Sequence, residues 1–194
     1  MQYFKLSIAF TVFLISSILF AEDGHHAKNV AIRFPAKLGD MTYKGVIKYA
    51  KPGGFSVRYQ DASQFRIDIY IYDGNKPNIG SGIDSKVLKN EFASVLLVFP
   101  YMEKLGHYKD VKIVDKGQKK VGETAFLWAQ YSFEQINKGG GNYLGKKISD
   151  TYIVGRKNYF IKLRMTMKKE DAAKKKKVKD KFLKDLGYLL LEGN

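Results

Sequence analysis

Cysteine is absent from this chain of 194 residues, and histidine is scarce, with three copies. Without cysteine, the chain has no disulfide scaffold, no cysteine nucleophile, no thiolate zinc site and no lipoprotein anchor. His25 and His26 adjoin near the N-terminus while His107 lies far along the chain, so they do not form the ligand set of a tetrahedral metal site. We therefore expect neither a metal site nor a cofactor.

Common catalytic motifs are missing as well. The sequence has no G-x-S-x-G elbow and no Ser/His/Asp ordering that would supply a nucleophile and its base. Residues 140–146 read G-x-x-x-x-G-K, but Lys147 stands where a phosphate-binding loop needs Ser or Thr to hold magnesium. We expect a non-enzymatic protein without catalytic residues. A hydrolase whose carboxylate or hydroxyl site follows no familiar pattern is an alternative.

The N-terminus has the layout of a signal peptide. Lys5 precedes an apolar run over residues 6–20, which closes on the small residue Ala21. The run is shorter than a membrane span and breaks directly into polar residues. We expect cleavage after Ala21 and export to the periplasm or the medium; a retained N-terminal anchor is the alternative. Residues 22–29 should form a flexible leader, and residues 30–194 a single domain.

Acidic residues are few beside basic ones, with 19 Asp and Glu against 34 Lys and Arg, which gives a formal net charge of +15. At 45% hydrophobic residues the chain is too apolar for a disordered basic tail and should bury a core. A basic surplus favours anionic partners. Because the chain has an export signal, we expect these to lie in the cell envelope, and we do not expect nucleic acid.

Hydrophobic periodicity indicates both strands and helices. Apolar and polar residues alternate over residues 55–60 and 65–72, which predicts a hairpin with one apolar face. Spacings of three and four predict a helix that begins at Asp84 and kinks at Pro100 or ends near Val98, followed by a short turn. A last helix should span residues 170–190. Further strands are predicted at residues 30–34, 43–50, 111–114, 125–133, 148–154 and 159–167.

The order strands-helix-strands-helix predicts an α+β fold with a single antiparallel β-sheet flanked by helices. If the apolar side of this sheet faces the helices, cations and aromatic rings gather on the other side. Such a face is typical of a binding surface, although ordinary cross-strand packing gives the same pattern. The candidate binding residues on it are Arg58, Arg66, Asp68, Tyr70, Tyr72, Trp128, Gln130, Lys162 and Arg164.

The last predicted helix is rich in lysine. Such a surface binds anionic lipid or lipopolysaccharide, or it is the solvated side of an amphipathic helix whose stripe of Val178, Phe182 and Leu186 packs on the sheet. The candidate residues for an anionic surface are Lys174, Lys175, Lys176, Lys177, Lys179 and Lys181.

Several short strings together resemble a known group of proteins. Phe34-Pro35, a Pro-Gly-Gly turn at residues 52–54, a strand ending at Asp73, and residues 159–164 before the last helix are similar to the exported bacterial Mog1/PsbP-like proteins. The resemblance implies an α/β sandwich. It also implies a binding, chaperone or assembly-accessory role, with no family catalytic residues to carry over.

The function expected from the sequence is therefore an exported, non-enzymatic binding or assembly-accessory protein that acts on a protein or another envelope component. The mixed polar and aromatic sheet face is the expected contact surface. Electrostatic binding of anionic lipid or lipopolysaccharide by the lysine-rich helix is the second hypothesis, and the hydrolase is the third.

Overall fold

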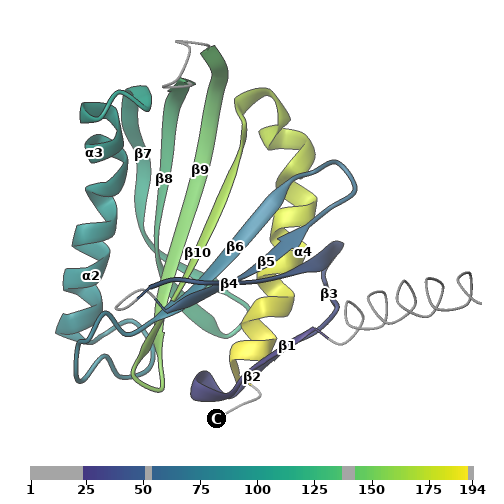
Figure 1. Ribbon diagram of the computed structural model, residues 1–194, viewed down its shortest axis with the longest axis vertical. Coiled ribbons are helices and arrows are strands. Elements are labelled where there is room, and N and C mark those ends of the chain that lie inside the picture. Colours follow the sequence, from purple (N-terminus) through teal and green to yellow (C-terminus); the bar gives the residue numbers. More distant parts are fainter. Residues whose placement is uncertain (1–23, 51–53, 137–142, 192–194) are drawn as a thin grey trace, which may run out of the picture.

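The computed structural model describes residues 24–50, 54–136 and 143–191. The expected signal peptide, residues 1–21, lies outside the described residues, as do residues 22 and 23 of the leader and residues 140–142 of the G-x-x-x-x-G-K segment. Within the described part, two antiparallel sheets form, one of eight strands and one of two. Three helices and two short 3-10 turns accompany them (Figure 1).

The large sheet has the order β3-β4-β5-β6-β10-β9-β8-β7. Its first half along the chain comprises β3 (Lys37–Leu38), β4 (Met41–Lys48), β5 (Phe55–Gln60) and β6 (Arg66–Tyr72). Its second half comprises β7 (Tyr108–Val121), β8 (Thr124–Ile136), β9 (Tyr143–Arg156) and β10 (Tyr159–Lys168). The last strand of each half lies at the centre, where β6 pairs with β10.

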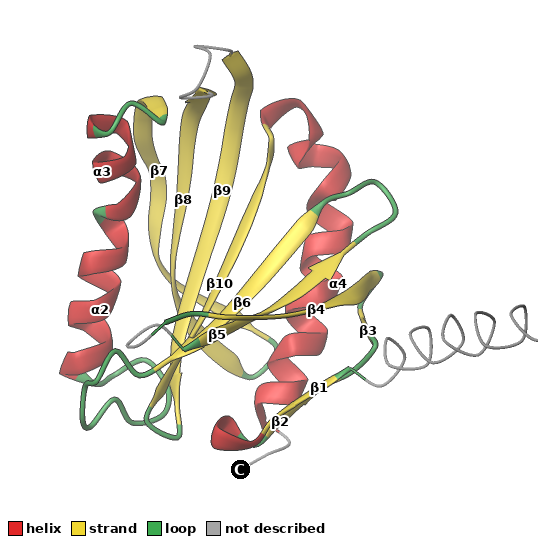
Figure 2. Ribbon diagram, in the orientation of Figure 1, coloured by secondary structure: helices red, strands yellow, loops and turns green. Residues whose placement is uncertain are grey.

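The remaining elements lie at the sheet's margins and on its faces. The small sheet pairs β1 (His25–Ala27) with β2 (Ile32–Phe34), and the 3-10 turn η1 (Lys28–Val30) joins them. Helices α2 (Lys86–Leu96) and α3 (Val98–Lys104) follow β6, and η2 (Lys169–Asp171) leads into α4 (Ala172–Leu191). Figure 2 shows α2 and α3 beside β7 and α4 across the sheet from them.

The predicted fold class, a single antiparallel sheet flanked by helices in the order strands-helix-strands-helix, is wrong. The described chain is mostly strand, and its strands form two sheets, because β1 and β2 pair with each other outside the large sheet. Alternation in sequence marks the centre of a strand but not its length. Strand β7 runs for 14 residues through an exposed, lysine-rich stretch, although the sequence predicts a strand only over residues 111–114.

The folded domain begins earlier than residue 30, where the sequence placed its start. Residues 25–29, expected in a flexible leader, belong to β1 and η1. Ala27 and Val30 are buried in the core, which explains the order of this segment.

Helix α2 begins after Ser85 rather than at the expected Asp84, because the Ser85 hydroxyl accepts a hydrogen bond from the Leu88 amide at 3.1 Å. The helix ends at Leu96, and α3 begins at Val98. Pro100 therefore lies in the first turn of α3, where a missing N–H leaves no hydrogen bond broken. This confirms the prediction of a helix that ends near Val98 and is followed by a short second one.

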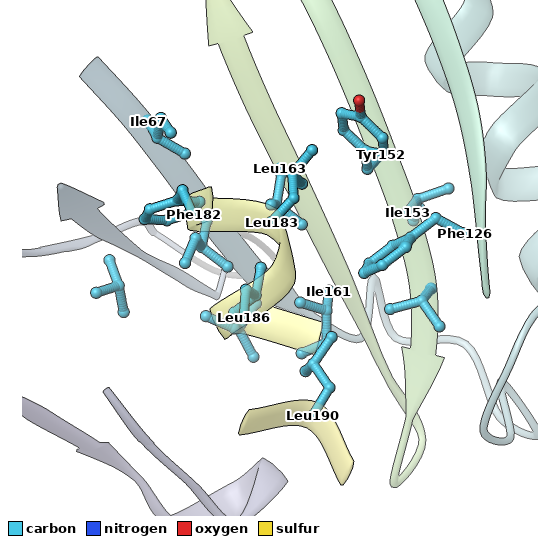
Figure 3. Packing of buried hydrophobic residues seen from close by; sticks show 14 of the residues in the cluster. Ile67, Phe126, Tyr152, Ile153, Ile161, Leu163, Phe182, Leu183, Leu186 and Leu190 are labelled. Carbon is cyan, nitrogen blue, oxygen red and sulfur yellow. The ribbon is translucent and has the colours of Figure 1, made fainter. Parts of the chain in front are cut away.

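The main core lies chiefly between α4 and one face of the large sheet, and it extends to α2 on the other face through Leu88 and Phe160. Phe182, Leu186 and Leu190 project from α4 toward the apolar side chains of the central strands (Figure 3). Among these, Ile161 and Leu163 of β10 are fully buried. A second, smaller core joins α3 to the other face at β7 and β8, through Phe99, Tyr108, Ala129, Tyr131 and Phe133.

No helix in the described ranges is both long and apolar enough to cross a membrane.

Gly187 lets α4 approach the sheet closely. A Cβ atom at this position would lie 2.9 Å from the backbone oxygen of Val121, so the helix or the hairpin would have to move. Thr124 also donates a hydrogen bond from its hydroxyl to the Gly187 carbonyl, at 3.1 Å.

We expect Gly187→Ala to lower the free energy of unfolding by about 1–3 kcal/mol, because the close contact outweighs alanine's higher helix propensity. Urea denaturation measures this change. Lys184→Ala, an exposed position on the same helix, is the control and should change stability by less than about 0.5 kcal/mol. A gain in stability from Gly187→Ala would contradict the close packing.

Candidate functional site

Strand register sorts the predicted binding residues onto two faces, because side chains paired across antiparallel strands lie on the same face. Arg58 pairs with Asp68, Asp68 with Arg164, and Arg164 with Thr151. Thr151 in turn pairs with Ala129, which packs under α3. These residues therefore lie on the face opposite α4, where α3 packs on β7 and β8 and α2 contacts β9.

We call the part of this face on β5, β6 and β10 the open face. It carries seven of the nine predicted residues, and most of them are partly exposed. They are Arg58, Arg66, Asp68, Tyr70, Tyr72, Lys162 and Arg164.

Asp68 holds two arginines together near the centre of the open face. Its carboxylate oxygens accept a hydrogen bond from Arg58 Nε at 2.7 Å and pair with Arg66 Nε at 3.1 Å. The Asp68 side chain is 8% exposed, so this carboxylate is desolvated and needs its cations. Two positive charges share one negative charge, and the cluster keeps a positive surplus.

Lys162 lies between aromatic rings next to this cluster. Its Nζ is 5.0 Å from the centre of the Tyr70 ring and 5.1 Å from that of Tyr72. Tyr49 stacks on Tyr70, with ring centres 6.1 Å apart. Burial lowers the pKa of Lys162 below its ordinary value, while Glu91 opposes this shift and Arg164 adds to it.

Arg164 marks the border between the open face and the helices. Its Nη2 donates a hydrogen bond to the Tyr108 hydroxyl at 2.8 Å, and its guanidinium carbon lies 4.8 Å from the centre of the Phe99 ring. A cation–π contact and one hydrogen bond fix the orientation of the group. Within the described ranges, no carboxylate forms an ion pair with Arg164.

A pocket of about 430 Å³ opens on this face beside Arg164. Three cations line it, Arg66, Lys147 and Arg164, together with Tyr70 and Tyr108. The neutral polar residues of the lining are Gln60, Gln64, Gln135 and Thr166, and Asp68 and Met167 complete it.

Trp128 and Gln130 lie on the opposite face, contrary to the prediction. Trp128 pairs with Tyr152, and Tyr152 pairs with Leu163, which is buried under α4. The prediction placed Trp128 and Gln130 on the polar side of the sheet, but the register of β8 against β9 places them on the α4 side. A strand's phase relative to a distant neighbour cannot be inferred from its own alternation.

Both side chains instead bind a buried carboxylate under α4. Asp150 has no exposed side-chain surface and accepts hydrogen bonds from Trp128 Nε1 at 3.2 Å and from Gln130 Nε2 at 3.0 Å. Its other oxygen accepts one from Lys179 Nζ at 2.7 Å. This cluster ties α4 to β8 and β9.

Four of the six candidate lysines are paired within the fold. Lys179 binds Asp150, Lys175 binds Asp61 at 2.5 Å, and Lys181 binds Asp40 at 2.5 Å. Lys176 pairs with Asp180 one helical turn away, at 2.5 Å. Lys174 and Lys177 are exposed. Much of the lysine-rich helix therefore contacts its own sheet and loops rather than presenting a free cationic surface.

The sequence missed several residues of the pocket. Gln60 could have been found, because it alternates in phase with Arg58 on the same strand. Lys147 and Tyr108 could not, because β9 and β7 begin earlier than their apolar pattern shows. In the described part of the chain, no three His, Asp or Glu side chains lie close enough to hold a metal ion.

Comparisons with known proteins identify no family. No family model and no curated protein matches this chain. Among solved structures, the crystal structure of a Pseudomonas aeruginosa protein of unknown function, described as a putative regulator, aligns at 8% identity with a TM-score of 0.40. The alignment covers 82% of this chain and 92% of that one. The resemblance to Mog1/PsbP-like proteins stays a prediction.

We expect Lys179→Met to lower the free energy of unfolding by about 3 kcal/mol, because it leaves the buried Asp150 carboxylate without its cation. Urea denaturation followed by circular dichroism measures the change. Lys176→Met is the matched control, since Lys176 and Asp180 are both exposed, and it should cost less than about 0.5 kcal/mol. Equal losses in the two variants would contradict a structural role for the Asp150 cluster.

Proposed function

We propose that this protein is an exported, non-enzymatic binding protein that holds another component of the bacterial envelope on its open face. One observation carries the proposal: a half-covered sheet face holds a pocket of about 430 Å³ lined by three cations. The main core occupies the α4 side of the sheet, and the smaller core under α3 lies toward β7 and β8. Helix α2 covers the end of the open face at Tyr72, whose hydroxyl donates a hydrogen bond to Glu91 at 2.9 Å. The part around the pocket is available for a ligand.

The geometry of the open face also supports binding. Its charged groups are oriented by contacts within the protein: Arg58 and Arg66 by Asp68, and Arg164 by Tyr108. Groups held in this way lose little conformational entropy when a ligand arrives. Aromatic and arginine side chains are also the types that dominate binding energy in protein interfaces.

The two alternatives have less support. Electrostatic binding of lipid or lipopolysaccharide needs free cations on α4, but Lys175, Lys179 and Lys181 pair with carboxylates of other elements. A hydrolase needs acidic groups or a nucleophile in the pocket. The one carboxylate in its lining is Asp68, which is already bound by two arginines.

We expect Arg66→Gln and Lys162→Gln to weaken retention of the envelope component by about tenfold or more, because each removes a cation from the open face. Capture from an envelope extract, with quantitative mass spectrometry of the retained components, measures this. Circular dichroism verifies that each variant is folded.

Lys177→Gln is the matched control, since it removes the same charge from an exposed position on α4. It should retain the same components as the unchanged protein. Loss of retention in Lys177→Gln, with full retention in the open-face variants, would contradict the proposal and favour the electrostatic alternative.

Export has its own test. When the full chain is expressed in a bacterium, we expect the mature protein to begin at Glu22, which follows the predicted cleavage after Ala21. Intact-mass spectrometry of the periplasmic and medium fractions detects the cleaved form. An uncleaved chain that stays with the membrane would support the retained anchor instead.

A further inference from the structure

The pocket on the open face has an uncompensated positive charge. Arg66, Lys147 and Arg164 line it, while its one carboxylate, Asp68, already binds Arg58 and Arg66. No ion pair engages Lys147 or Arg164 anywhere in residues 24–50, 54–136 and 143–191. Cations that share a partly enclosed site without enough counter-charge repel one another, and an anionic ligand relieves this repulsion.

Arg164 is oriented to meet such an anion. Nη2 of Arg164 donates a hydrogen bond to the Tyr108 hydroxyl at 2.8 Å, and the Arg164 guanidinium lies over the Phe99 ring. The planar group keeps other N–H donors, which suit the paired oxygens of a carboxylate or phosphate. Since Phe99 belongs to α3 and Tyr108 to β7, the fold holds this donor in place before any ligand binds.

The rest of the lining indicates a ligand that is polar over most of its surface. Gln135 and Gln64 offer amide donors to a ligand, and Gln135 also offers its amide oxygen, as sugar hydroxyl groups require. Gln60 already donates its Nε2 hydrogens to the side-chain and backbone oxygens of Gln64, and the Thr166 hydroxyl already shares a hydrogen bond with the Ser149 hydroxyl. Gln60 and Thr166 therefore contribute their remaining acceptor positions. Apart from Met167 and the rings of two tyrosines, the lining has no apolar residue. At about 430 Å³ the space exceeds the needs of an inorganic anion and suits a small organic ligand.

We propose that this pocket binds an acidic saccharide, a sugar that carries a carboxylate or a phosphate group. Lys147 and Arg164 bind the anionic group, and Arg66 adds a third positive charge to the lining. The glutamines and Thr166 form hydrogen bonds with the sugar hydroxyls. The inference rests on the proposed binding function of the open face and names the class of its ligand.

Isothermal titration calorimetry at low ionic strength tests the inference with five probes: glucuronate, glucose 6-phosphate, glucose, inorganic phosphate and a tetraglutamate peptide. We expect at least one acidic sugar to bind about tenfold more tightly than glucose and than inorganic phosphate. The acidic sugar contacts the cations as well as the glutamine amides, whereas glucose lacks the anionic group and phosphate lacks the sugar hydroxyls. Comparing glucuronate with glucose 6-phosphate distinguishes a carboxylate ligand from a phosphate ligand.

Variants connect the binding to the pocket. Lys147→Gln should weaken acidic-sugar binding by about tenfold, since it removes a cation that makes no ion pair in the described structure. Gln135→Ala should weaken the binding of acidic sugars and leave that of inorganic phosphate unchanged. Lys177→Gln on α4 removes the same charge as Lys147→Gln and should have no effect.

Three results would overturn the inference. They are equal affinity for acidic sugars and glucose, acidic-sugar binding that survives Lys147→Gln, and binding of tetraglutamate without binding of acidic sugars. If these occur while capture of an envelope component still depends on Arg66 and Lys162, the proposed function stands and only the ligand class fails.

Discussion

The packing of α4 against one face of the large sheet is the interaction on which the rest of the structure depends. The apolar stripe of α4 covers the central strands, and large apolar side chains such as Phe126, Tyr152 and Phe182 are fully buried there. Burial of this kind is the main favourable contribution to folding. Because α4 covers the apolar side, the side chains of β5, β6 and β10 that point the other way need not be apolar. The open face is the consequence.

Charges on that face are tolerated because each desolvated group has a compensating contact. The buried carboxylate of Asp68 forms ion pairs with Arg58 and Arg66. The ammonium group of Lys162 is partly removed from water, and it makes cation–π contacts with the rings of Tyr70 and Tyr72. Burying such groups costs stability unless hydrogen bonds and opposite charges offset the loss. Asp68 offsets only one of the two positive charges of Arg58 and Arg66, and Lys147 and Arg164 add further positive charge around the pocket. The pocket therefore lies in the region of the open face where positive charges outnumber negative ones.

Lysine has a second use in this protein, as a link between α4 and the rest of the fold. Lys179 reaches the buried Asp150, and Lys175 reaches Asp61 in the turn between β5 and β6. The long methylene chain of lysine packs along the helix while its ammonium group extends to a carboxylate beyond it. A run of lysines that suggests a surface for anionic partners thus contributes in good part to holding the helix on the sheet.

Local sequence was sufficient for the elements whose pattern lies within one segment. The alternation over residues 55–60 and 65–72 gave β5 and β6. The helical spacing after Asp84 and the break expected near Val98 gave α2 and the short α3. Composition alone excluded cysteine chemistry. The polar residues of β5, β6 and β10 were also assigned to a common face, because their phase follows directly from their own strands.

Contacts between residues far apart in the sequence determine the strand register, the pocket and the ion pairs that hold α4. The phase of β8 depends on its register against β9, so only the folded sheet places Trp128 and Gln130 under α4. The pocket gathers residues from six strands, and the Lys175–Asp61 pair joins positions 114 residues apart. Such pairings are fixed by the total burial and hydrogen bonding of the whole sheet, which no single segment of the sequence specifies.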